Sequence, residues 1–535
     1  MILLRVEGLC LEAEGMPLLN EVTFEIREGE IFALVGESGS GKSLTSLAIM
    51  RLLPESIDVA KGEIFLKGNA LFGLTEAAMQ KVRGKSIAMI FQEPMSALNP
   101  VMTIGEQVAE VIRLHLGLQK EAVKAKVVAL FEEVSLPKAA ERYDWYPHQL
   151  SGGQKQRVMI AMALACEPDL LIADEPTTAL DVTIQAQVLE LLKKIRAKRN
   201  LSILFITHDM AVVAQMADSI AVMKEGRLLE SAPRDAFFSS PRHPYTQQLL
   251  KDTVIIRSEE TREAAAERLL EVKGLKVYFP IQKGLFRRTV GVVKAVDGVS
   301  FSIARGKTLA LVGESGSGKS TIGQAILRLL DITEGEIRFR GVDLAALDEK
   351  RVKPYRSRIQ VVFQDPYSAL NPRMTIGEII REGMVSLQTG PSGKQAQAHH
   401  IAALLKKVGL EPEHLHRYPH EFSGGQRQRI GIARALAVEP ELIICDEPTS
   451  ALDVTVRAQV LSLLKSLQKD FGVSYLFITH DLSLIPAIAD EVAVMQEGRV
   501  VEQGSVDAVM CHPQHAYTRA LLQAAPQPPP VTRSP

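Results

Sequence analysis

The sequence predicts an α/β protein built from two tandem copies of one domain. Three observations support this prediction. The octet GESGSGKS occurs at Gly36–Ser43 and again at Gly313–Ser320. Each octet follows a short apolar run of the kind that forms a buried strand. Further strings recur downstream in the same order in both halves. A strand that leads through a glycine loop into a helix is the context in which this octet binds phosphate.

The repeat extends over most of the chain. Four strings of the first half return 272 residues later with at most one change each: FQEP at Phe91, SGGQKQR at Ser151, DEPTTALD at Asp174 and FITHD at Phe205. The stretch between the copies is charged and matches nothing in the other half, which is typical of a linker. We therefore predict a first domain at 1–250, a linker at 251–267, a second domain at 268–525 and a disordered proline-rich tail at 526–535.

The composition fits a globular protein and excludes several classes. Hydrophobic residues make up 46% of the 535 residues and charged residues 23%, which is ordinary for folded domains. The formal net charge of −1 gives no general attraction for nucleic acid or anionic membrane. Four cysteines without metal-ligand spacing indicate incidental thiols in a reducing compartment. The longest uncharged apolar run, Val158–Cys166, is far shorter than the roughly 20 residues that span a bilayer. We therefore expect another chain to supply any membrane span.

Apolar runs predict the strands that position these strings. A helix after the second octet is predicted by Ile322, Ala325, Ile326 and Leu329, which are spaced i, i+3, i+4, i+7. Ligands of open α/β sheets bind at the carboxyl ends of the strands. We therefore expect each octet to meet the aspartate that ends a neighbouring strand. The predicted strands are Ile31–Val35, Leu170–Asp174, Thr308–Val312 and Leu442–Asp446.

The octets are predicted phosphate-binding loops. Their glycines let backbone N–H groups turn toward phosphate oxygens at a helix N-terminus, which favours anions. Lys42 and Lys319 can reach the β- and γ-phosphates, and the serine after each lysine can ligate Mg²⁺. The predicted nucleotide-binding residues are Gly36, Glu37, Ser38, Gly39, Ser40, Gly41, Lys42 and Ser43 in the first half, and Gly313, Glu314, Ser315, Gly316, Ser317, Gly318, Lys319, Ser320 and Thr321 in the second.

Each half also carries an Asp-Glu pair at the end of an apolar strand. Asp174 and Asp446 suit a Mg²⁺ contact, direct or through water, and the glutamate after each is a natural general base for an attacking water. His208 and His480 follow these aspartates at the same distance, which favours a role at the γ-phosphate. The alternative interpretations are a surface carboxylate pair before a proline turn and a histidine that caps a strand end.

The strings LSGGQ at Leu150 and FSGGQ at Phe422 each open a helical stretch. One interpretation makes Ser151 and Ser423 plain N-caps. The other makes each string a second anion-binding helix N-terminus. The octet of the same half is already predicted to surround the phosphates. A nucleotide site built from one half alone therefore does not explain a second anion-binding string.

Together these strings resemble the ATP-binding-cassette (ABC) ATPases, in the family's order in both halves, and SGGQ is the family's signature. The resemblance implies two tandem cassettes, each with a mixed-sheet, RecA-like P-loop core and a helical subdomain, which bind ATP and Mg²⁺. Gln92 and Gln364 match the family's Q-loop glutamine, and Asp181 and Asp453 match its D-loop aspartate. The implied catalytic residues are Glu175, His208, Gln92, Glu447, His480 and Gln364, and the implied metal ligands are Ser43, Gln92, Asp174, Ser320, Gln364 and Asp446.

In this family two cassettes pack head to tail around two ATP molecules, so the resemblance implies that one chain forms both sites. Each half has the lysine, the Asp-Glu pair, the histidine and a signature, which favours two competent ATPase sites. One site would combine Lys42, Ser43, Gln92, Asp174, Glu175 and His208 with Ser423, Gly425 and Gln426. The other would combine Lys319, Ser320, Gln364, Asp446, Glu447 and His480 with Ser151, Gly153 and Gln154.

The halves differ at the aromatic residue that stacks on adenine in this family. Phe279 in LKVYFP matches that residue by similarity, whereas the first half has Ala13 at the corresponding place in LCLEAEG. The resemblance therefore implies adenine stacking on Phe279 and leaves the first half without the corresponding ring.

Longer strings narrow the resemblance to the ATPases of bacterial oligopeptide, dipeptide and nickel importers. They are FQEPMSALNPVMTIGE at Phe91, FQDPYSALNPRMTIGE at Phe363 and HPYT at His243. Here both ATPases are fused, as in some peptide, microcin C and glutathione importers. The resemblance implies ATP-driven uptake of a peptide-like solute through two integral-membrane permease subunits, with a periplasmic or surface solute-binding protein and no nucleic acid. The chain would lie peripherally on the cytoplasmic face of the bacterial inner membrane.

Some relatives carry an iron–sulfur cluster after HPYT, but Cys511 precedes the second tail, so we expect no cluster.

Two alternatives share the ATP-site motifs. One is a soluble tandem ABC ATPase that acts on ribosomes or nucleic acid, and the other is an exporter ATPase. The predicted linker is short and has more acidic than basic residues, so it gives no electrostatic footprint for RNA. This favours the importer but leaves its solute open among peptides, glutathione, opine-like compounds and nickel chelates.

Two smaller features have local interpretations. The TIGE strings predict helices capped by Thr103 and Thr375, each with a glutamate three residues on; in family terms this region receives the permease. The basic loop around Lys283, Arg287 and Arg288 is interpreted as a solvated hairpin, and the alternative places it near the membrane face.

Overall fold

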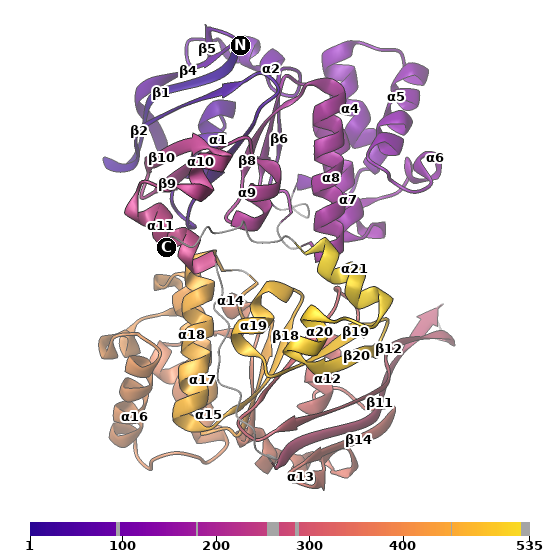
Figure 1. Cartoon of the computed structure of the whole chain (residues 1–535), viewed down its shortest axis with the longest axis vertical. Coiled ribbons are helices and arrows are strands. Elements are labelled where there is room, and N and C mark those ends of the chain that lie inside the picture. Colours follow the sequence, from indigo (N-terminus) through magenta and orange to yellow (C-terminus); the bar gives the residue numbers. More distant parts are fainter. Residues whose placement is uncertain (93–96, 178–179, 254–266, 284–287, 451, 526–535) are drawn as a thin grey trace. The chain divides into compact units, whose positions relative to one another are not determined.

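The structure is a computed structural model, and it describes residues 1–92, 97–177, 180–253, 267–283, 288–450 and 452–525. The chain divides into two compact units, in the main residues 1–254 and 255–525. Each unit contains one copy of the repeat, and each has a six-stranded sheet, a four-stranded sheet and a group of helices (Figure 1).

The first unit is built on a six-stranded sheet of order β10-β9-β3-β8-β7-β6, in which β10 runs antiparallel to β9 and the other neighbours are parallel. Alternate residues of its central strand enter different hydrophobic clusters, so both faces of the sheet are covered. The strands are β3 (Ile31–Val35), β6 (Ile87–Ile90), β7 (Leu170–Asp174), β8 (Ser202–Ile206), β9 (Ser219–Lys224) and β10 (Arg227–Pro233).

A four-stranded antiparallel sheet of order β2-β1-β4-β5 packs on one face of the parallel sheet. Leu4 and Ile64 of this sheet share a cluster with Phe32 and Leu34 of β3 and with Ile49 of the helix that follows the first octet. The strands are β1 (Ile2–Ala13), β2 (Met16–Arg27), β4 (Ile57–Leu66) and β5 (Asn69–Ala70), and the helix is α1 (Lys42–Met50).

The helices α4 to α7 of the first unit form a separate group beside the sheets (Figure 1). The side chain of Thr103 accepts a hydrogen bond from the backbone N–H of Glu106, so the predicted cap of α4 is confirmed. The helices of this unit are α2 (Glu76–Val82), α4 (Ile104–Leu116), α5 (Lys120–Glu133), α6 (Ala139–Arg142), α7 (Gly152–Ala163), α8 (Val182–Arg199), α9 (Met210–Met216), α10 (Arg234–Ser239) and α11 (Pro244–Thr253).

The second unit repeats this architecture, with sheets of order β16-β17-β18-β13-β19-β20 and β12-β11-β14-β15. Thr375 and Glu378 form a capping box at its α15, as predicted. The strands are β11 (Arg268–Lys283), β12 (Arg288–Ala304), β13 (Thr308–Val312), β14 (Glu334–Phe339), β15 (Val342–Asp343), β16 (Ile359–Val362), β17 (Leu442–Asp446), β18 (Ser474–Thr479), β19 (Glu491–Gln496) and β20 (Arg499–Ser505). The helices are α12 (Lys319–Ile326), α13 (Glu349–Val352), α14 (Pro366–Ala369), α15 (Ile376–Ser386), α16 (Lys394–Lys407), α17 (Gly424–Leu436), α18 (Val454–Phe471), α19 (Ile485–Ile488), α20 (Val506–Cys511) and α21 (Ala516–Ala524).

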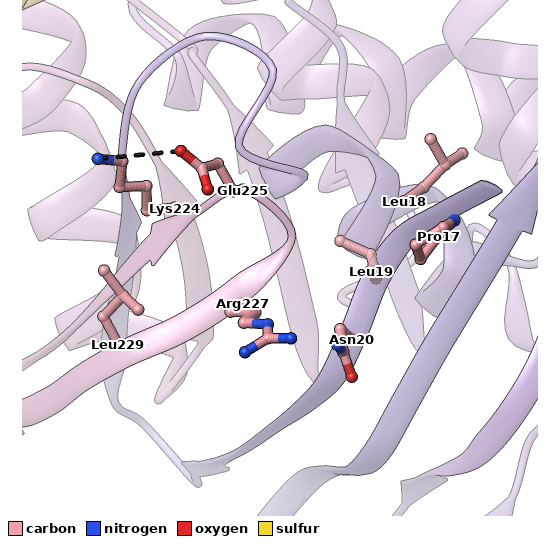
Figure 2. Close-up of a pocket in the computed structure, with 8 residues that line it drawn as sticks. All are labelled: Pro17, Leu18, Leu19, Asn20, Lys224, Glu225, Arg227 and Leu229. Atoms are coloured by element: carbon pink, nitrogen blue, oxygen red, sulfur yellow. Dashed lines mark ion pairs between the residues drawn. The ribbon is translucent and has the colours of Figure 1, made fainter.

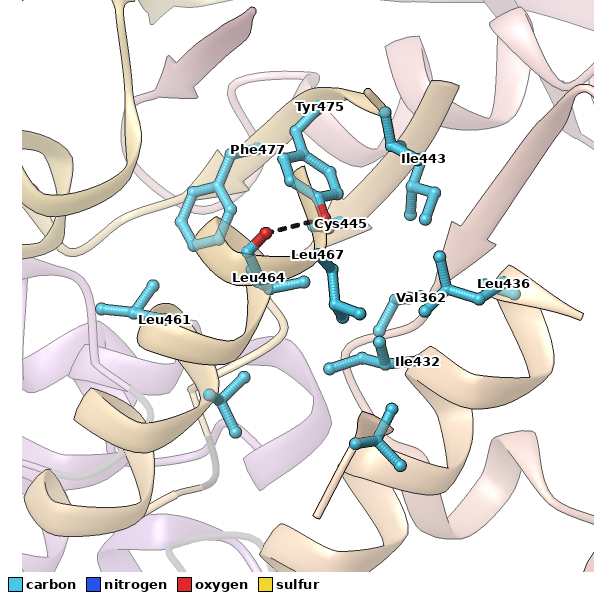
Figure 3. Packing of buried hydrophobic residues seen from close by; sticks show 14 of the residues in the cluster. Val362, Ile432, Leu436, Ile443, Cys445, Leu461, Leu464, Leu467, Tyr475 and Phe477 are labelled. Carbon is cyan, nitrogen blue, oxygen red and sulfur yellow. Dashed lines mark hydrogen bonds between the residues drawn. The ribbon is translucent and has the colours of Figure 1, made fainter. Parts of the chain in front are cut away.

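One side of the second parallel sheet packs on α17 and α18 (Figure 3). Cys445, Tyr475 and Phe477 are fully buried there. The hydroxyl of Tyr475 donates a hydrogen bond of 3.0 Å to the carbonyl of Leu464. Burial raises the pKa of the Cys445 thiol, which fits the interpretation of this cysteine as an incidental core thiol.

Truncating this core is expected to destabilise the second unit. Phe477→Ala removes a fully buried ring and should lower the free energy of unfolding by about 3–5 kcal/mol, because the neighbours cannot fill the cavity. Chemical denaturation followed by circular dichroism measures this loss. The matched control is Leu329→Ala at an exposed side chain, which should stay within about 0.5 kcal/mol of the wild type.

The prediction of a helix through Leu329 is wrong. The helix α12 ends at Ile326, and Arg328 adopts a left-handed φ of 54°, which turns the chain away. Ile322, Ala325 and Ile326 are buried as predicted, but Leu329 is 55% exposed. The 3.6-residue spacing continues past the place where the backbone leaves the helix.

Some predicted segments lie partly or wholly outside the described residues. The helix α11 continues to Thr253, three residues into the predicted linker, and residues 254–266 lie outside the description. The same holds for the tail at 526–535 and for Arg287 of the basic loop. Within the parts of the chain that are described, no helix is both long and apolar enough to cross a bilayer.

Candidate nucleotide sites

Each octet forms a glycine loop between a parallel strand and a helix. Gly36 and Gly313 adopt φ values of 153° and 151°, and a Cβ on either would lie 2.2 or 2.3 Å from a backbone carbonyl of β9 or β19. Only glycine fits such a close approach. The ammonium of Lys42 donates to the carbonyls of Gly36 and Glu37 at 2.9 and 2.8 Å. Lys319 makes the same two bonds, at 2.7 and 2.8 Å.

Adding one methyl group to this loop is expected to weaken nucleotide binding at the second octet strongly. In Gly313→Ala the new Cβ would meet the carbonyl oxygen of Met495 at 2.3 Å, and backbone oxygens cannot rotate away as side chains do. We expect ATP affinity at that loop to fall by more than about tenfold, measured by equilibrium binding. The control is Gly431→Ala within α17, where a Cβ meets nothing within 4 Å; this variant should bind ATP normally.

The serine after each lysine lies beside the predicted aspartate. The hydroxyl of Ser320 donates to Oδ1 of Asp446 at 2.9 Å. Burial raises the pKa of Asp446 and that of Asp174, the latter to about 6. Among the described residues, the buried Oδ1 of Asp174 has no hydrogen-bond partner. A serine hydroxyl beside a buried carboxylate with an unused oxygen is the hard oxygen donor set that Mg²⁺ prefers, so these residues fit the cation.

In the first unit the predicted glutamine, glutamate and histidine converge at the carboxyl edge of the sheet. Gln92 Nε2 donates to one carboxylate oxygen of Glu175 at 2.9 Å. His208 Nδ1 lies 3.0 Å from the other oxygen. Glu175 directly follows β7 and has a left-handed φ of 47°. A glutamate in that strained conformation requires support from its surroundings, and the two side chains on its carboxylate supply it.

The second unit repeats this triad of side chains. Gln364 Nε2 donates to Glu447 at 2.9 Å, and His480 Nδ1 lies 3.0 Å from the other carboxylate oxygen. Burial alone would raise the pKa of Glu447, but the adjacent imidazole of His480 outweighs burial and lowers that pKa. The neighbouring Glu447 in turn raises the pKa of His480, although burial alone would lower it. The carboxylate is therefore held ionised and oriented, as a general base must be.

The signature serines are N-caps, as one interpretation predicted. The hydroxyl oxygen of Ser151 accepts a hydrogen bond of 3.4 Å from the backbone N–H of Gln154. The side-chain oxygen of Gln154 accepts one of 3.2 Å from the backbone N–H of Ser151. Ser423 forms the same capping box with Gln426. A Cβ on Gly425 would lie 2.3 Å from Val456 of α18, so glycine permits close helix packing there. The phosphate-facing role of these serines stays a prediction.

The aromatic positions differ as the sequence indicates. Phe279 on β11 is 39% exposed and is therefore accessible to a flat ligand. Its neighbour Tyr278 is engaged instead: its hydroxyl donates to the carboxylate of Asp297, which also accepts from Arg499 at 2.7 Å. The hydrogen bond from Tyr278, and after it the one from Arg499, lower the pKa of Asp297 to about 2. No local pattern in the sequence indicates this network, because Arg499 lies about two hundred residues from Tyr278 and Asp297.

The first unit has a pocket at the place that corresponds to this network (Figure 2). Arg227 and Asn20 stand where the second unit has Arg499 and Asp297. The N–H of Asn20 donates to the carbonyl of Gly226, whose own N–H donates to Ser40 of the phosphate loop. The cavity has a volume of about 320 Å³ and is lined by Pro17, Leu18, Leu19, Asn20, Lys224, Glu225, Arg227 and Leu229.

The sequence matches the family model described as ABC transporter at residues 19–178 and 296–450. These two matches together cover more than half of the chain. The chain belongs to the ABC transporter family. It is an ATP-binding subunit with two cassettes, and ATPases of this kind are coupled to transport. A second model, the oligopeptide/dipeptide transporter C-terminal region, matches residues 229–275 and 501–534.

Curated relatives of this ABC subunit match it over nearly its full length. The glutathione import ATP-binding protein GsiA of Salmonella paratyphi A is 47% identical, over 98% of this chain and 89% of the relative. The uncharacterized ABC transporter ATP-binding protein YejF of Escherichia coli is 50% identical, over 94% of this chain and 95% of the relative. Among solved structures, cbiO1 of Clostridium perfringens is 29% identical, over 46% of this chain and 92% of that chain, with a TM-score of 0.40.

Proposed function

We propose that this ABC subunit hydrolyses ATP to power the uptake of a peptide-like solute through two partner permease subunits. The observation that carries the proposal is the full-length similarity to a glutathione import subunit, together with an oligopeptide/dipeptide C-terminal region in each half. The chain would lie peripherally on the cytoplasmic face of the inner membrane, held there by its permeases. A periplasmic or surface binding protein would deliver the solute.

We propose a chemical role for the main residues of each ATP site, and the observed contacts support these roles. Backbone N–H groups of the octet surround the phosphates, and Lys42 and Lys319 move from their carbonyl partners to the β- and γ-phosphates. Glu175 and Glu447 accept the proton of the attacking water, and His208 and His480 hold those carboxylates by one oxygen.

Ser43, Asp174 and Gln92 would hold Mg²⁺ in the first cassette, and Ser320, Asp446 and Gln364 would hold it in the second. When bound there, the cation would supply positive charge against the negative charge that develops on the transferred phosphoryl group. The buried Oδ1 of Asp174 and the adjacent serines support this assignment.

We further propose that the two cassettes form both sites head to tail, as the duplicated signature predicts. Ser423, Gly425 and Gln426 would close the site of Lys42, and Ser151, Gly153 and Gln154 would close the site of Lys319. A helix N-terminus completes the γ-phosphate site on closure, so ATP favours the closed state by its differential contacts. Phe279 would stack on the adenine of the second site.

Affinity purification of the chain from gently solubilised cells tests the importer proposal. Two polytopic membrane proteins in the purified complex would support it, and their binding protein would lead to the solute. Recovery of ribosomes or nucleic acid with no membrane protein would contradict the importer and favour a soluble tandem ATPase.

A further inference from the structure

The HPYT string and its twin HAYT open α11 and α21, the last helix described in each unit. In α21, Nδ1 of His515 accepts a hydrogen bond of 3.2 Å from the backbone N–H of Tyr517. His243 makes the same contact with the N–H of Tyr245 at 3.1 Å in α11. The histidine therefore fixes the start of each helix, as an N-cap does.

A glutamate on the edge strand fastens this start to the sheet. In the second unit the carboxylate of Glu502 on β20 accepts from the N–H groups of Gln514 and His515 at 2.7 and 3.1 Å. Burial alone would raise the pKa of Glu502, but the hydrogen bonds from those backbone amides help to keep that pKa below its usual range. Glu230 makes the same two amide bonds in the first unit. The helix start is therefore tied to the strand at several points.

From this anchored start, Tyr517 reaches the phosphate loop of its own cassette. Its hydroxyl oxygen accepts a hydrogen bond of 3.3 Å from the backbone N–H of Glu314, the second residue of the octet. The carbonyl of Glu314 accepts from Lys319 Nζ at 2.8 Å and from the N–H of Ser317 at 3.2 Å. Glu314 is therefore bonded on both sides: its N–H donates to Tyr517, and its carbonyl accepts from Lys319, the predicted phosphate-binding lysine.

We propose that Tyr517 is a positioning residue that fixes the phosphate loop of the second cassette through Glu314 and links the C-terminal region to the nucleotide site. The phenol acts on the loop and not on the phosphates, so it stabilises the arrangement that the nucleotide meets. This inference rests on the proposed role of Lys319 in binding ATP. It concerns the second cassette, where the phenol contacts the loop. In the first cassette the ring of Tyr245 lies 4.7 Å from the ammonium of Lys224, where the second has Gln496.

Tyr517→Phe in the full chain tests the proposal, because it removes the hydroxyl and keeps the ring. Lys42→Ala in the background removes nucleotide binding at the first loop, so that binding reports the second. Losing one hydrogen bond to the loop should raise the Kd for ATP about two- to tenfold. The chain should unfold at the same temperature as its parent. The matched control is Tyr355→Phe, a tyrosine of the same unit that packs on Phe339 away from the loop, and its Kd should not change.

Hydrogen exchange gives a second readout that a purely structural role would not move. The peptide that contains Glu314 should exchange faster in Tyr517→Phe, while core peptides such as that of β17 exchange as before. An unchanged Kd together with unchanged exchange at Glu314 would overturn the proposal. If the Lys42→Ala parent itself binds no ATP, the proposed function of the second site fails, and the inference fails with it.

Discussion

Replacing Glu175 and Glu447 together by Gln is expected to slow ATP turnover at least about a hundredfold and to leave ATP binding intact. The amide keeps the size of the carboxylate and can still accept from Gln92 or Gln364 through its oxygen. It cannot take a proton from water. Steady-state phosphate release measures turnover, and equilibrium binding measures the affinity for ATP.

The outcome separates a catalytic role from a structural one. Glu349→Gln changes an exposed carboxylate whose side chain is 88% accessible and should leave both measurements unchanged. Normal hydrolysis in the double variant would contradict the assignment of the bases. Loss of both binding and turnover would indicate instead that the strained glutamates support the loops around them.

The strands that carry the sites could be predicted from the sequence because they are short, wholly apolar and bounded by diagnostic strings. Ile31–Val35 and Thr308–Val312 form strands at those bounds. A strand buried on both faces needs an unbroken apolar run, so its limits are visible in the residues themselves. The helix after the second octet shows the opposite case, because its apolar spacing continues through Leu329 although the backbone turns at Arg328.

The contacts that tune the sites could not be predicted, because they join residues from distant parts of the chain. Tyr517 meets Glu314 across about two hundred residues of sequence, and no local pattern indicates which amide a tyrosine reaches. The same is true of Asp297, which is held by Tyr278 and Arg499. By contrast, the convergence of Gln92, Glu175 and His208 follows from the rule that carboxyl ends of parallel strands share one edge.

Ser423→Asp is expected to lower ATP turnover about a hundredfold if the signature of the second cassette faces the phosphates of the first. The capping box alone predicts no loss, because aspartate caps a helix as well as serine does. A phosphate-facing residue behaves differently, since a carboxylate there repels the γ-phosphate. The matched control is Ser505→Asp at the N-cap of α20, which should leave turnover unchanged.

Photolabelling with an azido-ATP shows which loop the signature serves. After labelling of Ser423→Asp, peptide mapping should find the loss in peptides around Lys42 and not in those around Lys319, because the proposed sites pair opposite halves. Loss confined to Lys319 would mean that each signature serves its own cassette. The duplicated octet would then form two independent sites, and the head-to-tail arrangement would be contradicted.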